Sequence, residues 1–181
     1  KNYSCEGMTR TIRDWLVISF WTGSRISEFM KFNYDTNVKL TKTGARCIEF
    51  EQPKTKKTVK VPINPDVEKI LRDRGNSFPE KVSDQHYNDK LKELISKMPE
   101  LGFNEVVSLK KRTQTKVNGV TEQRKRVIKT EKYKGISSHI GRRSWCTHHY
   151  NHTKLPVEVL MRVSGHEKVK TFLSYIKVTP D

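Results

Sequence analysis

The sequence predicts an α+β fold that is mainly helical, arranged as a single compact domain with small antiparallel β hairpins. Apolar residues recur at helical spacing over most of the chain, and two short strand-like runs are joined by a turn. No internal repeat or Ser/Gly-rich linker divides the sequence. With 181 residues, 34% of them hydrophobic, the chain is long enough to bury one core.

The first half is expected to combine helices with one hairpin. A helix over Thr9–Phe20 stops at Gly23, and Ser24 can then cap a second helix that holds Arg25, Glu28, Phe29 and Phe32. Strand-like runs over 46–51 and 58–63 flank a Pro-Lys-Thr-Lys-Lys turn, which is typical of a hairpin. The two further helices expected in this half run from Pro65 to Gly75 and from Ser83 to Met98.

The second half opens with a basic, β-prone stretch. Helical periodicity disappears after Val106, and Val117-Asn118-Gly119-Val120 is a hairpin turn signal, so an exposed β-ribbon or a mobile loop is expected over about residues 106–134. Helical spacing then returns. Three helices are expected. The first is capped at Ser137 or Ser138 and reaches Tyr150, and the second runs from Pro156 to Gly165. The third is short and carries Phe172, Tyr175 and Ile176.

Charge is the most informative bulk property. Lys and Arg number 36 against 20 Asp and Glu, which gives a net charge of +16 and a pI near 9.8. Self-repulsion of this size does not stabilise a fold, so it favours a polyanionic partner: nucleic acid first, an anionic membrane surface second. A merely solvated basic surface is the alternative. The basic residues gather in 54–60, 110–116 and 124–134.

Other bulk features favour a soluble protein of a reducing compartment. The longest apolar run, Trp15–Trp21, is too short to cross a bilayer, and no secretion leader opens the chain. Cys5, Cys47 and Cys146 form no Cys-x-x-Cys pair, which indicates reduced thiols rather than disulfides or zinc ligands. A cytoplasmic location is therefore expected, with no membrane partner.

Four local patterns follow one another in a fixed order. They are Thr22-Gly23-Ser24-Arg25-Ile26-Ser27-Glu28, then Lys54 in the hairpin turn, then His139-Ile140-Gly141-Arg142, and finally Gly165-His166 with Tyr175 nine residues later. The ordered set resembles the catalytic signature of the tyrosine recombinase, or phage integrase, family. The motifs Gln-x-Lys-Thr and His-x-x-Arg-Arg-Ser most resemble those of integrases from Bacteroides-type mobile elements, transposons and prophages.

The resemblance implies a metal-independent DNA transesterification that suits these residue types. Tyr175 would be the nucleophile and would hold the cleaved strand as a 3′-phosphotyrosyl link, which preserves the bond energy for rejoining. Arg25 and Arg142 would grip the scissile phosphate, because guanidinium forks match phosphate geometry and stay charged. No cofactor is expected.

The remaining signature residues would handle protons and orientation. His139 and His166 would donate hydrogen bonds to the phosphate, and His139 could also manage the proton of Tyr175. Lys54, or a neighbouring lysine, would protonate the departing 5′ oxygen. Glu28, one helical turn beyond Arg25, would orient basic side chains rather than touch DNA.

Outside the signature, basic residues are candidates for DNA binding. They are Lys56, Lys57, Lys110, Lys111, Arg112, Lys116, Arg124, Lys125, Arg126 and Arg143. The segment over about 106–134 is equally compatible with a phosphate-tracking arm and with a mobile charged loop. His148, His149 and His152 lack a Cys or an acid at ligand spacing, so they are expected to be surface or core residues and no metal site is expected.

The resemblance therefore implies a site-specific DNA recombinase or integrase of a bacterial mobile element, acting on double-stranded DNA in the cytoplasm. Residues 1–181 correspond to the catalytic domain, with the core-binding and arm-binding domains absent. Recombinase protomers in a synaptic tetramer would be its partners, and a monomeric state of the fragment is left open. A type IB topoisomerase and a non-catalytic basic DNA-binding module are the alternatives.

Overall fold

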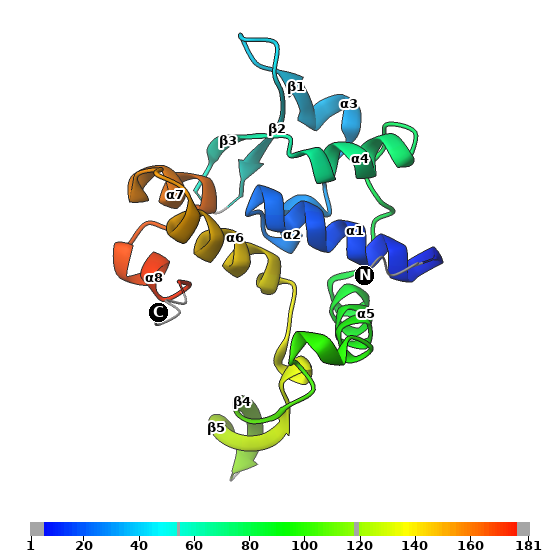
Figure 1. Ribbon diagram of the computed structural model, residues 1–181. Helices are drawn as coiled ribbons and strands as arrows, with labels where there is room; N and C mark the ends of the chain where they lie inside the picture. The colour runs from blue at the N-terminus through cyan, green and yellow to red at the C-terminus, as the bar shows by residue number, and fades with distance from the viewer. Residues whose placement is uncertain (1–5, 54, 118–119, 177–181) are drawn as a thin grey trace. The chain divides into compact units, whose positions relative to one another are not determined.

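The computed structural model describes residues 6–53, 55–117 and 120–176, with the backbone alone for 111–125 (Figure 1). Helices dominate and two small antiparallel sheets accompany them, which confirms the predicted mainly helical α+β class. Within this fold the chain forms two compact units. The first combines Lys1–Tyr87 with Ser138–Asp181, and the second is Asn88–Ser137.

Helix α1 (Gly7–Thr22) is central to the first unit. Ile12, Trp15 and Ile18 recur at helical spacing and are completely buried, so one face of the helix lies in the core. The helix ends at Gly23, whose φ of 64° is left-handed and suits glycine. The expected stop signal is confirmed.

The short helix α2 (Ile26–Phe29) begins differently from the prediction. Arg25, not Ser24, is its N-cap residue, and the backbone N–H of Arg25 donates to Glu28 Oε2 at 2.7 Å. The hydroxyl of Ser24 instead pairs with the hydroxyl of Thr22 at 2.6 Å. The expectation that Ser24 caps this helix is wrong, because a carboxylate from the first turn supplies the acceptor that the end of the helix needs.

A three-stranded antiparallel sheet follows, in the order β1-β2-β3. Its strands are β1 (Val38–Leu40), β2 (Arg46–Gln52) and β3 (Lys57–Pro62), preceded by the one-turn helix α3 (Tyr34–Asn37). The predicted hairpin is confirmed as β2 and β3, whose last pair is Gln52 with Lys57. Strand β1 and helix α3 were not predicted, because segments of three or four residues show no period.

The remaining helices are α4 (Pro65–Asp73), α5 (Asp84–Ser96), α6 (His139–His152), α7 (Val157–Ser164) and α8 (Val169–Leu173). Helix α6 packs against α1 (Figure 1). The contact is close at Gly141, where an added Cβ would overlap Ser19 Oγ and lie 3.2 Å from the backbone nitrogen of Phe20. Tyr175 lies in the turn after α8 and not within the helix as expected.

The second unit contains a long β-ribbon. Strands β4 (Val106–Val117) and β5 (Val120–Glu131) pair without a break in register from Val106↔Glu131 to Val117↔Val120. The 3-10 turns η1 (Pro99–Leu101) and η2 (Lys132–Gly135) precede and follow it. Of the two expectations for this segment, the structure has the ribbon; the Asn118-Gly119 turn lies outside the described residues.

No helix within the described ranges combines the length and the apolar character that a membrane crossing requires.

Candidate functional site

Arg142 is a buried cation, and some of its hydrogen-bond donors have no partner among the described residues. The residue is only 1% exposed, and its Nη1 donates to the carbonyl oxygen of Gly23 at 2.8 Å. Its Nε and Nη2 find no acceptor among the residues that the structure describes. Buried donors without partners are rare because each costs the free energy of its lost hydration. The arrangement therefore fits an anion that would bring the missing acceptors.

The electrostatics of Arg142 agree with that reading. Burial, and after it the positive charge of Arg25, lowers the pKa of Arg142 to about 10. The guanidinium remains protonated at neutral pH, yet it is held where its charge is poorly solvated. Its environment is arranged to attract negative charge rather than to stabilise the cation.

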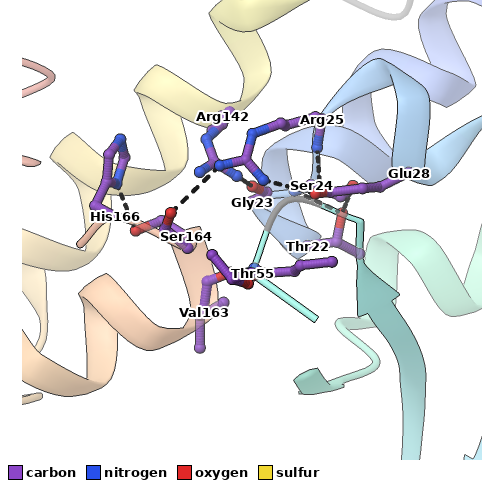
Figure 2. Close-up of polar contacts among 12 residues, drawn as sticks. Thr22, Gly23, Ser24, Arg25, Glu28, Thr55, Arg142, Val163, Ser164 and His166 are labelled. Atoms are coloured by element: carbon purple, nitrogen blue, oxygen red, sulfur yellow. Dashed lines mark hydrogen bonds and ion pairs between the residues drawn. The ribbon is translucent and has the colours of Figure 1, made fainter. Parts of the chain in front are cut away.

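Arg25 is held in place by one acid and one carbonyl. Its Nη1 forms an ion pair of 2.7 Å with Oε1 of Glu28, and its Nη2 donates to the carbonyl oxygen of Gly165 at 3.4 Å. Glu28 is buried and also accepts from the Arg25 backbone, so the side chain of this arginine is fixed at both ends. Figure 2 shows the guanidinium groups of Arg25 and Arg142 next to each other.

His139 is the first residue of α6, one turn before Arg142. Although the residue as a whole is exposed, burial of its ring lowers the pKa of His139, and the positive charges of Arg142, Arg25 and Arg143 lower it further. The imidazole is therefore neutral at neutral pH, and a neutral imidazole can accept a proton.

His166 and Tyr175 meet ring to ring. Their ring centroids are 4.5 Å apart in an edge-to-face arrangement, and His166 Nδ1 shares a hydrogen bond of 2.8 Å with the hydroxyl of Ser164. The guanidinium of Arg143 lies 5.3 Å from the centre of the Tyr175 ring. These contacts place the phenol beside cationic and imidazole groups.

The structure thus brings together five of the six signature residues: Arg25, His139, Arg142, His166 and Tyr175. Electrostatic coupling links Arg142 to Tyr175 as well as to Arg25, and links His139 to both arginines. Lys54 lies outside the described residues. The cluster combines two fixed guanidinium groups, two imidazoles and one phenol, and this set suits nucleophilic attack on a bound phosphodiester.

Two residues of this region have no role in the sequence-based prediction. Ser164 is completely buried and holds His166, and Gln52 is completely buried at the end of β2. The sequence offered a signal only for Gln52, as the first letter of Gln-x-Lys-Thr, but no chemistry pointed to its role.

The predicted DNA-binding residues occupy different settings. Lys56 and Lys57 are exposed at the β2–β3 turn, and Lys110 and Arg126 are exposed on the ribbon. Arg143 is also exposed, but its guanidinium lies over the ring of Tyr175 and donates to the Ser174 carbonyl at 3.4 Å. For Lys111, Arg112, Lys116, Arg124 and Lys125 the structure describes the backbone alone.

The three other histidines of α6 pack among aromatic rings. His148 contacts Phe20 and Trp21, and His149 contacts Trp145, with centroid distances between 4.6 and 5.8 Å. Across the described residues, no three His, Cys, Asp or Glu side chains are arranged to hold a metal ion.

A mainly helical α+β frame with two arginines, two histidines and a tyrosine in one cluster defines the tyrosine recombinase class. The sequence matches the phage integrase family over residues 4–181, and the chain belongs to that family. No curated protein matches the chain.

Solved structures share the fold. The integrase of transposon Tn1549, in complex with a circular intermediate DNA, has a TM-score of 0.55 and 16% identity over 97% of this chain and 57% of its own. The XerH site-specific recombinase, bound to its difH substrate, has a TM-score of 0.58 and 13% identity over 97% of this chain and 46% of its own. The chain therefore spans about half the length of these proteins.

Proposed function

We propose that residues 1–181 form the catalytic domain of a site-specific tyrosine recombinase or integrase. The domain cleaves and rejoins double-stranded DNA through a covalent 3′-phosphotyrosyl link at Tyr175. One observation carries the proposal: the buried guanidinium of Arg142 has two nitrogens without an acceptor in the described part of the chain, and it lies beside Arg25 and close to a tyrosine. The two similar structures are DNA complexes of an integrase and a recombinase, which supports DNA as the substrate.

The scissile phosphate binds between Arg25 and Arg142. Its non-bridging oxygens accept from Nε and Nη2 of Arg142, the atoms that lack acceptors within the described residues. The ion pair with Glu28 keeps the guanidinium of Arg25 from turning away. Preorganised donors of this kind stabilise the pentavalent transition state, in which negative charge grows on the same oxygens.

Strand cleavage transfers two protons. The phenol oxygen of Tyr175 attacks phosphorus and loses its proton to the neutral imidazole of His139. The bond between phosphorus and the 5′ oxygen breaks, and that oxygen takes a proton from the ammonium group of Lys54. Rejoining reverses each step: the 5′ hydroxyl attacks, the phenol leaves, and both protons return.

The wider setting is proposed on the same basis. The exposed cations of the β4–β5 ribbon follow DNA phosphates, and recombinase protomers assemble on DNA as a synaptic tetramer. The protein acts in a bacterial cytoplasm, in the integration or excision of a mobile element. The chemistry uses protein groups alone and needs no added cofactor.

The test is covalent capture on a nicked suicide duplex that carries the recombination site, with the full-length parent protein. We expect a protein–DNA adduct on denaturing gels that resists EDTA and is lost in Tyr175→Phe. Tyr150→Phe, which changes a more exposed tyrosine of α6, is the matched control and should retain the adduct.

Three outcomes would contradict this function. An adduct that survives Tyr175→Phe would show that Tyr175 is not the nucleophile. Loss of cleavage on chelation would indicate a metal nuclease. Relaxation of supercoiled plasmid that lacks the site would instead favour a topoisomerase, which swivels one strand rather than exchanging two.

A further inference from the structure

Ser164 is the last residue of α7, and it is completely buried beside the imidazole of His166. Its hydroxyl oxygen lies 2.6 Å from the carbonyl oxygen of Leu160 and 2.8 Å from Nδ1 of His166. A hydroxyl has one proton to donate, whereas a carbonyl oxygen can only accept. The position of this one proton therefore decides which nitrogen of His166 carries a hydrogen.

One arrangement of protons satisfies both of these contacts. The hydroxyl proton must lie on the contact with Leu160, because two oxygen atoms 2.6 Å apart with no hydrogen between them would repel each other. The carbonyl oxygen of Met161, 3.4 Å from the same hydroxyl, is likewise an acceptor and offers no proton. The serine oxygen is then left as an acceptor, so Nδ1 of His166 must donate to it. In the neutral ring, Nε2 consequently carries no hydrogen.

The imidazole of His166 is fixed in orientation by its neighbours. Its ring meets the rings of Phe172 and Tyr175 edge to face, with centroid distances of 5.7 Å and 4.5 Å. Figure 2 shows the bond to Ser164 as a dashed line on one side of the imidazole, while the other ring nitrogen points away from the serine. The ring cannot turn over to exchange its two nitrogens without losing this bond.

The end of α7, on which this contact depends, is itself held in place. Gly165 ends the helix with a left-handed φ of 59°, and the backbone N–H of His166 donates to the Met161 carbonyl at 3.0 Å. The buried amide of Gln52 donates to the Val163 carbonyl at 2.7 Å, and a Cβ added at Gly165 would lie 2.5 Å from the oxygen of that amide. The hydroxyl that faces the imidazole therefore has a fixed position.

We propose that Ser164 is a positioning residue, which fixes the proton of the neutral His166 ring on Nδ1 and leaves Nε2 as the nitrogen that takes part in the reaction. The proposal rests on the function proposed above and adds a part to it. A neutral His166 is then a proton acceptor in the site, and it donates to a phosphate oxygen only as an imidazolium, after Nε2 has gained a proton. Both charge states keep the bond from Nδ1 to the serine, so the ring gains and loses protons without moving.

The first test reads the hydrogens of the ring directly by NMR. In the full-length parent protein, isotopically labelled at its histidine ring nitrogens, long-range proton–nitrogen correlations distinguish a nitrogen that carries a hydrogen from one that does not. The variant His166→Gln identifies the signals of this ring by their loss. At a pH high enough for the ring to be neutral, we expect a hydrogen on Nδ1 and none on Nε2.

The variant Ser164→Ala should shift this hydrogen to Nε2 in a measurable share of the molecules, because the acceptor for Nδ1 is gone. A hydrogen on Nε2 in the neutral ring of the wild type, or the same tautomer in Ser164→Ala, would overturn the proposal.

The second test determines whether Ser164 acts through His166. We expect Ser164→Ala to form the covalent adduct about 10- to 100-fold more slowly, because a histidine loses the partner that orients it. In a His166→Gln background the same change should cost less than about 2-fold. Ser96→Ala is the matched control and should leave the rate unchanged. Ser96 is also the last residue of a helix, α5, and its hydroxyl donates to the carbonyl of Glu93 at 2.8 Å.

Equal losses in the two backgrounds would overturn the proposal, because Ser164 would then support the fold rather than His166. An unchanged rate in Ser164→Ala would overturn it as well. If the wild-type protein forms no adduct at Tyr175, the proposed recombinase function fails, and the NMR measurement alone decides whether Ser164 fixes the tautomer of His166.

Discussion

The proposed active site and the β4–β5 ribbon use positive charge in opposite ways. In the active site, Arg25 is fixed by an acid and a carbonyl, and Arg142 is buried. On the ribbon, Lys110, Arg126 and Lys129 are exposed. The strand register also sets cationic positions directly opposite each other, Lys111 with Arg126 and Arg112 with Lys125.

The fixed arginines of the proposed active site suit catalysis, whereas the exposed cations of the ribbon suit affinity for DNA. A few cations held in one orientation can stabilise a transition state, because no reorganisation is needed when charge develops. Many exposed cations along a ribbon neutralise phosphates and release counterions, which gives affinity that depends on salt but little on sequence. Both arrangements oppose folding in the absence of a ligand, the first through desolvation and the second through repulsion across the strands.

The largest effect is expected at Arg142. Arg142→Met should slow adduct formation by about 100- to 1000-fold or more, because it removes preorganised donors to the phosphate. The free energy of unfolding should stay the same or rise by on the order of 1 kcal/mol, since a buried and poorly paired charge is removed. Suicide-substrate kinetics and thermal unfolding measure the two effects.

Arg162→Met, at an exposed position of α7, is the control and should change neither quantity. A variant of Arg142 that unfolds at a much lower temperature would show that the arginine supports the fold rather than the chemistry, and the contrast with the ribbon would be lost.

The second effect concerns the ribbon. The triple variant Lys110→Gln, Arg126→Gln and Lys129→Gln should weaken DNA binding and reduce the slope of log affinity against log salt by roughly 0.9 for each lost phosphate contact. The rate of cleavage within the bound complex should be unchanged. Binding titrations at several salt concentrations give the slope.

Three exposed lysines of the first unit provide a variant of equal charge loss: Lys31→Gln, Lys39→Gln and Lys69→Gln. Equal slopes for the two triple variants would mean that net charge matters and the position on the ribbon does not.

A smaller effect is expected from pH. Because burial and three neighbouring arginines lower the pKa of His139 below its ordinary 6.5, the midpoint of its protonation lies on the acid side of pH 6.5. Single-turnover cleavage from about pH 5 to about pH 8 should therefore fall only on the acid side of 6.5. The His139→Gln variant should cleave slowly, and its rate should not fall further below pH 6.5. If the same fall persists in this variant, another group is responsible for it.

The smallest effect is the response of stability to a simple anion. Inorganic sulfate at about ten times its Kd should stabilise the wild-type protein by about 1.4 kcal/mol, which raises Tm by roughly 3–6 °C. The gain should vanish in Arg142→Met and persist in the ribbon triple variant. An equal gain in both variants would place the bound anion elsewhere.

Much of the fold could be predicted because its signals are local. Helix α1 ends at Gly23 as its left-handed φ requires, and the β2–β3 hairpin follows from alternation and its turn. Strand β1 was missed because its three residues are too few to show a period. The cap of α2 was misassigned because the acceptor came from Glu28, three residues inside the helix, and not from the preceding serine.

The sequence predicted which residues form the site, but it did not predict the contacts that hold them in place. The signature named His139 and Arg142, which lie one helical turn apart on α6, and the structure places both near Arg25. That Arg142 is almost completely buried depends on the packing of α6 against α1, which sequence spacing does not encode. Gln52 donates to a carbonyl 111 residues away, and no local pattern could reveal this contact.

The close contact of Gly141 with α1 has a consequence for how such a protein can change. This glycine lies between His139 and Arg142, so any side chain there would push the whole helix outward and displace both groups at once. The distance between α1 and α6 therefore sets the positions of His139 and Arg142. Engineered variants should therefore keep Gly141 and its contact with α1.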